Sequence, residues 1–209
     1  MLENLFWDTC VFIRYFVGDP EQPHFSDICR FVEEAKAGKR KIHFSTITMA
    51  EFTAEHFRNT DFGSVREFLE DMGSACIPID PNPNIMIGSS ELRSVTPTDP
   101  GRPHKPAKRV ISTPDAIILM TCVYARDAYG ISDIVLHSTD EGKGANWAGR
   151  CVPIVGFERW YPDPTRTERI DEVCSLQRSK SIHPEPQLEG IVIHGRFNTQ
   201  RSNTDQPTN

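Results

Sequence analysis

The segment Leu5–Phe12, with the sequence LFWDTCVF, is the part of the chain that says most about the fold. Its first three residues are large and apolar and predict a short buried strand over 5–7. The apolar run from Thr9 to Val17 predicts a helix directly after that strand. A buried strand followed at once by a helix is typical of α/β proteins.

The same alternation of strands and helices recurs along the rest of the chain. We expect helices over 26–37, 46–57, 65–72, 84–93 and 113–128, and strands over 41–45, 75–79, 134–137 and 151–155. Thr113-Pro114 is a strong helix start, since a hydroxyl can cap a helix and proline suits the first helical position. Strands alternating with helices predict a parallel sheet covered on both faces. The expected fold class is therefore α/β, a three-layer α/β/α architecture with a central, mostly parallel sheet.

The composition divides the chain into a body and a tail. Residues 1–164 carry the alternating pattern and are expected to form one domain, with a basic surface loop over 95–108. Residues 165–209 are short of large apolar residues and end in a polar run. Such a composition predicts a flexible, polar C-terminal extension, in which 188–194 could form a short strand.

Charge and cysteine usage exclude several classes of protein. The chain has 209 residues and a net charge of −6, which argues against nucleic-acid binding by bulk charge alone. Six cysteines occur without a Cys-x-x-Cys pair, so we do not expect a zinc knuckle. The longest apolar run, Ala116–Ala125, is far shorter than the ~20 residues of a membrane span, and the N-terminus does not resemble a signal peptide. We expect a cytoplasmic protein without membrane contact.

Four carboxylates stand in apolar company. Asp8 ends the first strand, Glu51 lies within an apolar helical run, Asp115 opens an apolar helix, and Asp140 follows the strand expected over 134–137. The C-terminal ends of parallel strands meet at one edge of a sheet, so this edge can gather all four. Converging carboxylates raise one another's pKa unless a cation neutralises them, and an oxygen-only cluster suits Mg²⁺ or Mn²⁺.

Each acid taken singly also has a structural explanation. Asp8 can cap a helix, Asp140 can stabilise a turn, and the helix dipole favours Asp115 near the start of its helix. Glu51 fits such an explanation least well, because a carboxylate beside a core-facing helical stripe is costly without a partner. The case for a functional site therefore depends on the four acids acting together.

The order and spacing of these motifs resemble a known family. A hydrophobic strand ends in Asp8-Thr9, an Ile-Thr-x-x-Glu helix spans 47–51, an Asp-Ala-x-Ile helix spans 115–118, and Thr139-Asp140 follows a strand. Together they resemble the PIN domain of metal-dependent ribonucleases, whose small members include the toxins of bacterial type II toxin–antitoxin pairs. The resemblance covers roughly residues 3–157 and leaves the tail unmatched.

What the resemblance implies is an endoribonuclease that hydrolyses RNA phosphodiester bonds with one or two Mg²⁺ or Mn²⁺ ions. Asp8, Glu51, Asp115 and Asp140 would then be the catalytic residues and metal ligands. The resemblance also implies RNA as substrate, a toxin role with a cognate antitoxin protein as partner, and a homodimer.

Three neighbours of these acids are further candidates. Thr9 and Thr139 flank ligands and could hydrogen-bond a carboxylate or a phosphate. Glu141 could replace an additional acid that relatives carry two residues after the last motif. Cys10 stands where relatives commonly have Asn or Ser, and its apolar neighbourhood suggests a core residue.

RNA would need cations on this acidic body. Basic side chains occur in two short runs that could contact phosphates. The candidates for substrate binding are Lys39, Arg40, Lys41, Lys105, Lys108 and Arg109. Solvated surface positions explain these runs equally well.

Two other functions stay open at this stage. The first is a catalytically inactive PIN scaffold that binds RNA or a protein, which the presence of all four acids argues against. The second is a metal-dependent DNA nuclease or phosphatase, which the lack of a DNA-binding appendage disfavours.

Overall fold

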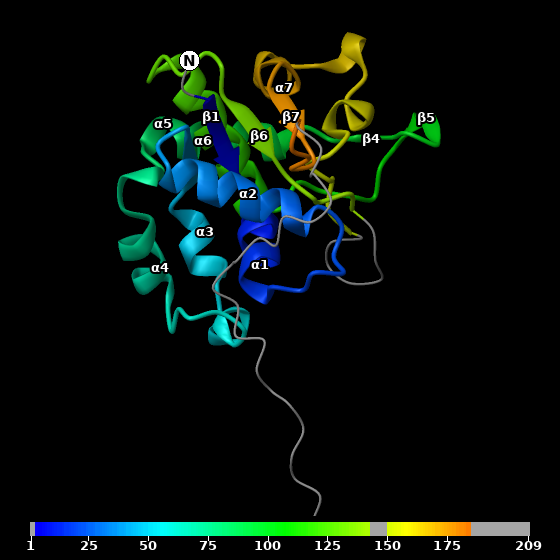
Figure 1. Cartoon of the computed structure of the whole chain (residues 1–209). Coiled ribbons are helices and arrows are strands. Elements are labelled where there is room, and N and C mark those ends of the chain that lie inside the picture. Colours follow the sequence, from blue (N-terminus) through cyan, green and yellow to red (C-terminus); the bar gives the residue numbers. More distant parts are fainter. Residues whose placement is uncertain (1–2, 143–149, 185–209) are drawn as a thin grey trace, which may run out of the picture.

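A five-stranded parallel sheet forms the centre of the computed structural model, which describes residues 3–142 and 150–184 (Figure 1). The strands are β1 (Glu3–Trp7), β2 (Arg40–Ser45), β3 (Cys76–Ile79), β6 (Val135–His137) and β7 (Gln177–Ser179). Their order across the sheet is β3-β2-β1-β6-β7, and every neighbouring pair is parallel. In the central strand, Leu5 lies opposite Ile42 on one side and Val135 on the other.

Helices cover both faces of the sheet. One face carries α1 (Thr9–Val17), α2 (Phe25–Lys36) and α4 (Val65–Met72), and the other carries α5 (Pro83–Ser94), α6 (Thr113–Asp127) and α7 (Glu168–Cys174). The reason is visible in β1, where side chains alternate between faces. Leu5 and Trp7 join the core under α1 and α2, whereas Phe6 joins the core under α5 and α6. The three-layer α/β/α fold expected from the sequence is therefore confirmed.

Most expected helices have close to their expected limits, because local signals define their ends. The hydroxyl of Ser112 accepts the N–H of Asp115 at 3.1 Å and caps α6, one residue earlier than the Thr113 cap expected. Gly38, the residue after the helix expected over 26–37, takes a left-handed conformation with φ of +75° two residues after α2.

The helix expected over 46–57 is wrong, because the chain breaks in its middle. It forms α3 (Ile47–Glu51) and a separate 3₁₀ turn, η1 (Ala54–Phe57). Phe52 and Thr53 between them are extended, and Thr53 caps η1 together with His56. The break lets Phe52 pack edge-on against Phe12, so burial of an aromatic ring and a local cap outweigh helix continuity.

Two further expectations in the second half of the body are wrong. The segment 95–108 is not a plain loop, because it contains a two-stranded antiparallel hairpin of β4 (Thr98–Asp99) and β5 (Arg102–Pro106). The Asp99 carboxylate accepts the N–H of Gly101 and pairs with Arg102, which closes the turn. The strand expected over 151–155 is reduced to a single bridge between Val110 and Cys151.

The folded body does not end at residue 164. Short turns η4 (Phe157–Trp160) and η5 (Asp163–Thr165) lead into α7 and then into β7, which extends the central sheet beside β6. Ile170, Val173 and Leu176 are buried in the same core as α6, and these few apolar residues are enough to anchor the segment. The expected tail is thus part of the domain as far as Pro184, and the strand expected over 188–194 lies outside the described residues.

Two further observations concern the cysteines and the length of the helices. All six cysteines are free thiols, and four of them are buried. None of the helices in the described part of the chain combines the length and apolar content needed to cross a bilayer. A short 3₁₀ turn, η2 (Gly73–Ala75), joins α4 to β3.

Candidate active site

The sheet has one point at which the strand order reverses, and it lies between β1 and β6. From β1 the chain adds β2 and β3 on one side, and later adds β6 and β7 on the other. Such a reversal leaves a crevice outside the carboxyl ends of the two central strands, where α/β proteins bind ligands. Asp8 follows β1 and Asp140 lies three residues after β6, so both are at this crevice. The N–H of Asp8 donates to the carbonyl of His137 at 3.0 Å, which holds the two strand ends together.

Asp8 is the most enclosed of the four acids, with 4% of its surface exposed. It occupies the N-cap position of α1, yet its side chain makes no capping hydrogen bond. Its Oδ2 instead accepts from the Ser138 hydroxyl at 2.8 Å and from the Cys10 thiol at 2.9 Å. Helix capping therefore does not explain this carboxylate, which is oriented by the neighbouring strand end.

Asp115 lies in the first turn of α6 and is electrostatically coupled to the other acids. Burial, followed by the negative charge of Asp8, raises the pKa of Asp115 to about 7, with smaller contributions from Asp140 and Glu51 and an opposing hydrogen bond with Ser112. Burial likewise raises the pKa of Asp8 to about 6, against its hydrogen bonds with Cys10 and Ser138 and with the help of Asp140 and Glu51. The structure thus brings all four carboxylates within electrostatic range of one another.

Glu51 ends the short helix α3 and is half-buried. The Thr9 hydroxyl donates to its Oε2 at 2.5 Å. Burial raises the pKa of Glu51, while the hydrogen bond from Thr9 acts in the opposite direction. Thr9 therefore orients a carboxylate, which is one of the two contacts that the sequence suggested for it.

Asp140 has a structural task as well as a place at the crevice. Its Oδ1 accepts the N–H of Gly142 at 2.9 Å, and its Oδ2 accepts the N–H of Ile154 at 3.2 Å. These bonds hold a turn together and tie it to the segment after residue 150. A carboxylate oxygen has a second lone pair, so these contacts leave acceptor capacity on Asp140.

Sequence reasoning missed two donors beside Asp8. Ser138 has no motif of its own, and Cys10 looked like a core residue, whereas its thiol contacts Asp8 and its sulfur accepts the N–H of Thr139 at 3.1 Å. Burial first, and then the charge of Asp8, raise the pKa of Cys10 well above its usual range, so it stays a neutral donor. Ser138 directly follows β6 as Asp8 directly follows β1, and this matching position is the signal that could have identified Ser138. Glu141, a candidate extra acid, pairs instead with Lys180.

The carboxylate oxygens of the four acids are the kind of ligand that a hard divalent cation prefers, although the four side chains are spaced apart from one another. Among residues 3–142 and 150–184, no Lys or Arg forms an ion pair with Asp8, Glu51, Asp115 or Asp140. In the same part of the chain, no three His, Cys, Asp or Glu side chains are close enough to hold an ion by themselves. Mg²⁺ usually keeps several waters and takes one or two carboxylates, so an open set of oxygens is compatible with it.

The first basic run lies at the wrong edge of the sheet for contact with these acids. Lys39, Arg40 and Lys41 are at the start of β2, level with Glu3, about 13 Å from the other end of β1 at ~3.3 Å per residue. Arg40 is buried, pairs with Glu3 and Glu34, and stacks on a phenylalanine ring. These three residues therefore do not contact the four acids, and their role in substrate binding stays a prediction.

In the second basic run, one residue has a structural role and two are exposed to solvent. The Arg109 guanidinium donates to the carbonyls of Gly142 and Cys151, at 3.0 and 2.9 Å, and lies over the ring of Trp160. Arg109 therefore braces the chain beside Asp140. Lys105 and Lys108 are exposed on and after the hairpin.

Comparison with known proteins does not assign the chain to a family. No protein-family model, curated protein or solved structure matches the chain.

Proposed function

We propose that this chain is a divalent-metal-dependent endoribonuclease with a PIN-like arrangement of acids. The observation that carries the proposal is the buried Asp8 at the strand-order reversal, coupled to three further carboxylates that no described Lys or Arg neutralises. Uncompensated buried charge destabilises a fold, so such a cluster is typical of a functional site. A homodimer and a cognate antitoxin belong to the same proposal through the family resemblance alone, and a cytoplasmic location belongs to it through the cysteine usage.

Asp8 and Asp115 would be the principal holders of a Mg²⁺ or Mn²⁺ ion, because they are the two acids whose pKa rises most. Such an ion would supply charge neutralisation at the reacting phosphate and activation of a water. Ser138 and Cys10 fix the Asp8 carboxylate, and Thr9 fixes that of Glu51. These contacts hold the acids in position before substrate arrives, which lowers the reorganisation that the reaction requires.

Cleavage of a labelled single-stranded RNA in Mg²⁺, in Mn²⁺ and in a chelator tests this proposal. We expect metal-dependent internal cleavage that Asp8→Asn lowers at least 100-fold, which corresponds to about 2.7 kcal/mol. Asp61→Asn makes the same chemical change at an exposed position and should cleave like the unmodified protein. Cleavage of single-stranded DNA but not of RNA would assign a DNA nuclease instead.

A non-catalytic RNA-binding role is the second candidate, and two observations favour it. Asp140 is engaged by two backbone N–H groups, and the described acids are spaced too widely to hold an ion by themselves. Binding of the same RNA without cleavage in any metal would establish this role.

The toxin role has its own test. Induced expression in a bacterial host should arrest growth, and Asp8→Asn should relieve the arrest. Normal growth during expression of a protein that cleaves RNA in vitro would remove the toxin role and leave the nuclease.

A further inference from the structure

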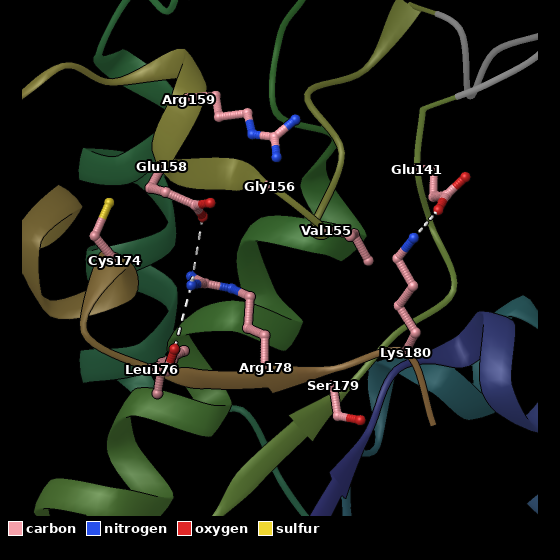
Figure 2. Close-up of a pocket in the computed structure, with 10 residues that line it drawn as sticks. All are labelled: Glu141, Val155, Gly156, Glu158, Arg159, Cys174, Leu176, Arg178, Ser179 and Lys180. Carbon is pink, nitrogen blue, oxygen red and sulfur yellow. Dashed lines mark hydrogen bonds and ion pairs between the residues drawn. The ribbon is translucent and has the colours of Figure 1, made fainter. Parts of the chain in front are cut away.

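The structure contains a cleft of about 680 Å³, and Figure 2 shows the residues that line it. It lies between the segment around η4, helix α7 and the carboxyl end of β7. Its volume falls within the roughly 300–1,000 Å³ that ligand sites occupy. None of the four acids lines it, so it is a separate surface.

Backbone hydrogen bonds join this cleft to the proposed active site. The N–H of Val155, on the cleft wall, donates to the carbonyl of Asp140 at 3.0 Å. The next residue along the chain, Glu141, lines the cleft itself. The carbonyl of Ser179, which also lines the cleft, accepts the N–H of Ser138. The hydroxyl of Ser138 in turn donates to the Asp8 carboxylate. The cleft wall and the proposed active site are therefore joined through the backbone, between Val155 and Asp140 and between Ser179 and Ser138.

The charged lining of the cleft is positive overall. Arg159 comes from η4, whereas Arg178 and Lys180 come from β7 and the residue directly after it (Figure 2). Two acids, Glu141 and Glu158, line the same cleft. The set therefore carries a formal charge of +1, which is three positive charges less two negative. This balance suits a phosphodiester, which has one negative charge per phosphate, better than a doubly charged terminal phosphate.

Two of the three cations are available to a ligand. The Arg159 side chain is exposed, and in the described chain no acid or carbonyl partner engages its guanidinium. It lies over Gly156, where an added Cβ would be 3.6 Å from the Arg159 Cδ. Lys180 is 44% exposed, and its pair with Glu141 is of the surface kind that contributes little and exchanges readily.

Arg178 has a different role from the other two. Its Nη1 and Nη2 donate to the carbonyls of Leu176 and Val173, and its charge lies 3.9 Å from Glu158. The guanidinium is largely buried over the ring of Phe157. Arg178 is therefore a buried positive charge held in place by the protein, whereas Arg159 and Lys180 are exposed side chains that can turn toward a ligand.

We propose that this cleft binds the phosphodiester backbone of the RNA strand adjacent to the phosphate that is cut, with Arg159 and Lys180 as phosphate contacts. The inference rests on the proposed nuclease function for its substrate, and it assigns phosphate contacts to cations outside the four acids. Neither of the two basic runs noted in the sequence contributes to this cleft.

Binding of a fluorescein-labelled 12-nucleotide single-stranded RNA, followed by anisotropy in a chelator, tests the proposal without cleavage. We expect Arg159→Ala and Lys180→Ala each to raise Kd about fivefold and to lower the slope of log K against log[salt] by about 0.7, the contribution of one single-strand phosphate contact. Arg159→Lys should restore most of the affinity. Arg66→Ala, which removes an exposed cation on α4 away from the cleft lining, should leave Kd unchanged.

The outcomes separate this inference from the nuclease proposal. Unchanged Kd and salt slope in both alanine variants, or no RNA binding by the unmodified protein, would overturn the cleft assignment even if RNA is cleaved in Mn²⁺. Displacement of the RNA by an equal concentration of uridine 5′-monophosphate would overturn it as well, because a terminal phosphate would then be preferred. Loss of affinity in both variants without cleavage in any metal would support the cleft and remove the nuclease.

Discussion

Replacing Asp115 by Asn should stabilise the metal-free protein at pH 8. The pKa of Asp115 rises from its ordinary 3.8 to about 7, because the carboxyl is buried and faces the charge of Asp8. Each pKa unit is worth about 1.4 kcal/mol, so the ionised carboxylate destabilises the fold by about 4 kcal/mol at most. Asn keeps the shape and removes the charge, and the capping bond from the Asp115 N–H to Ser112 does not involve the side chain. We expect a gain of about 2–4 kcal/mol.

The gain should depend on pH in a defined direction. The folded protein keeps the Asp115 proton up to about pH 7, whereas the unfolded chain loses it near pH 3.8. Between these values the folded state binds more protons, so the stability contributed by Asp115 falls as pH rises and is constant above about pH 7. The advantage of Asn should therefore be large at pH 8 and nearly absent at pH 4.

Urea unfolding in a chelator at pH 4 and at pH 8, followed by circular dichroism, measures the effect. Asp61→Asn is the matched control, since this exposed carboxylate should change stability by less than about 0.5 kcal/mol at either pH. A stability gain in Asp115→Asn that is equal at both pH values, or a loss at pH 8, would refute the electrostatic reasoning. In Mn²⁺ at 100 times Kd the unmodified protein should gain about 2.7 kcal/mol, and Asp115→Asn should gain far less.

Three further predictions concern the fold. Phe12→Ala removes a ring that packs against several other aromatic rings of the core and should lower the free energy of unfolding by about 3–5 kcal/mol in urea. Ile170→Ala should cost about 2–5 kcal/mol in the same assay if α7 belongs to the core, and a change below about 0.5 kcal/mol would contradict that role. Gly142→Ala should cost about 1–2 kcal/mol or more in thermal unfolding, because φ is +63° and the new Cβ would meet Arg109 at 2.5 Å.

The sheet was predictable from sequence because most of its signals are local. The strands β1, β3 and β6 each contain a short apolar run, and caps or prolines mark the starts of several of the helices. The errors at 46–57 and in the expected tail had non-local causes. The break at Phe52 depends on packing against Phe12 from a distant helix, and β7 depends on pairing with β6 rather than on its own composition, Gln177–Ser179 being entirely polar.

The candidate site was predictable in part for the same reason. Asp8 and Asp140 could be placed at strand ends from the alternation of elements, and the parallel order then brings those ends together. The orientation of the Asp8 carboxylate could not be inferred, because it depends on Ser138 from another strand. The position of Lys39, Arg40 and Lys41 could have been inferred, because they lie at the start of a parallel strand whereas the acids follow strands. The burial of Arg40 and its pairs with Glu3 and Glu34 could not, because they depend on the packing of other elements.

In the described part of the chain, the four acids of the proposed active site lie outside the cleft that Arg159, Arg178 and Lys180 line, and that separation has a physical consequence. A lysine or arginine placed directly among Asp8, Asp115 and Glu51 would relieve their repulsion and stabilise the fold, yet it would also remove the charge that attracts a divalent ion. In the described part of the chain, Arg159 and Lys180 lie in a separate cleft, and none of these three acids pairs with a lysine or arginine. If the proposed ion binds at these acids, its charge would offset their repulsion, and ion binding would recover the stability that the repulsion costs.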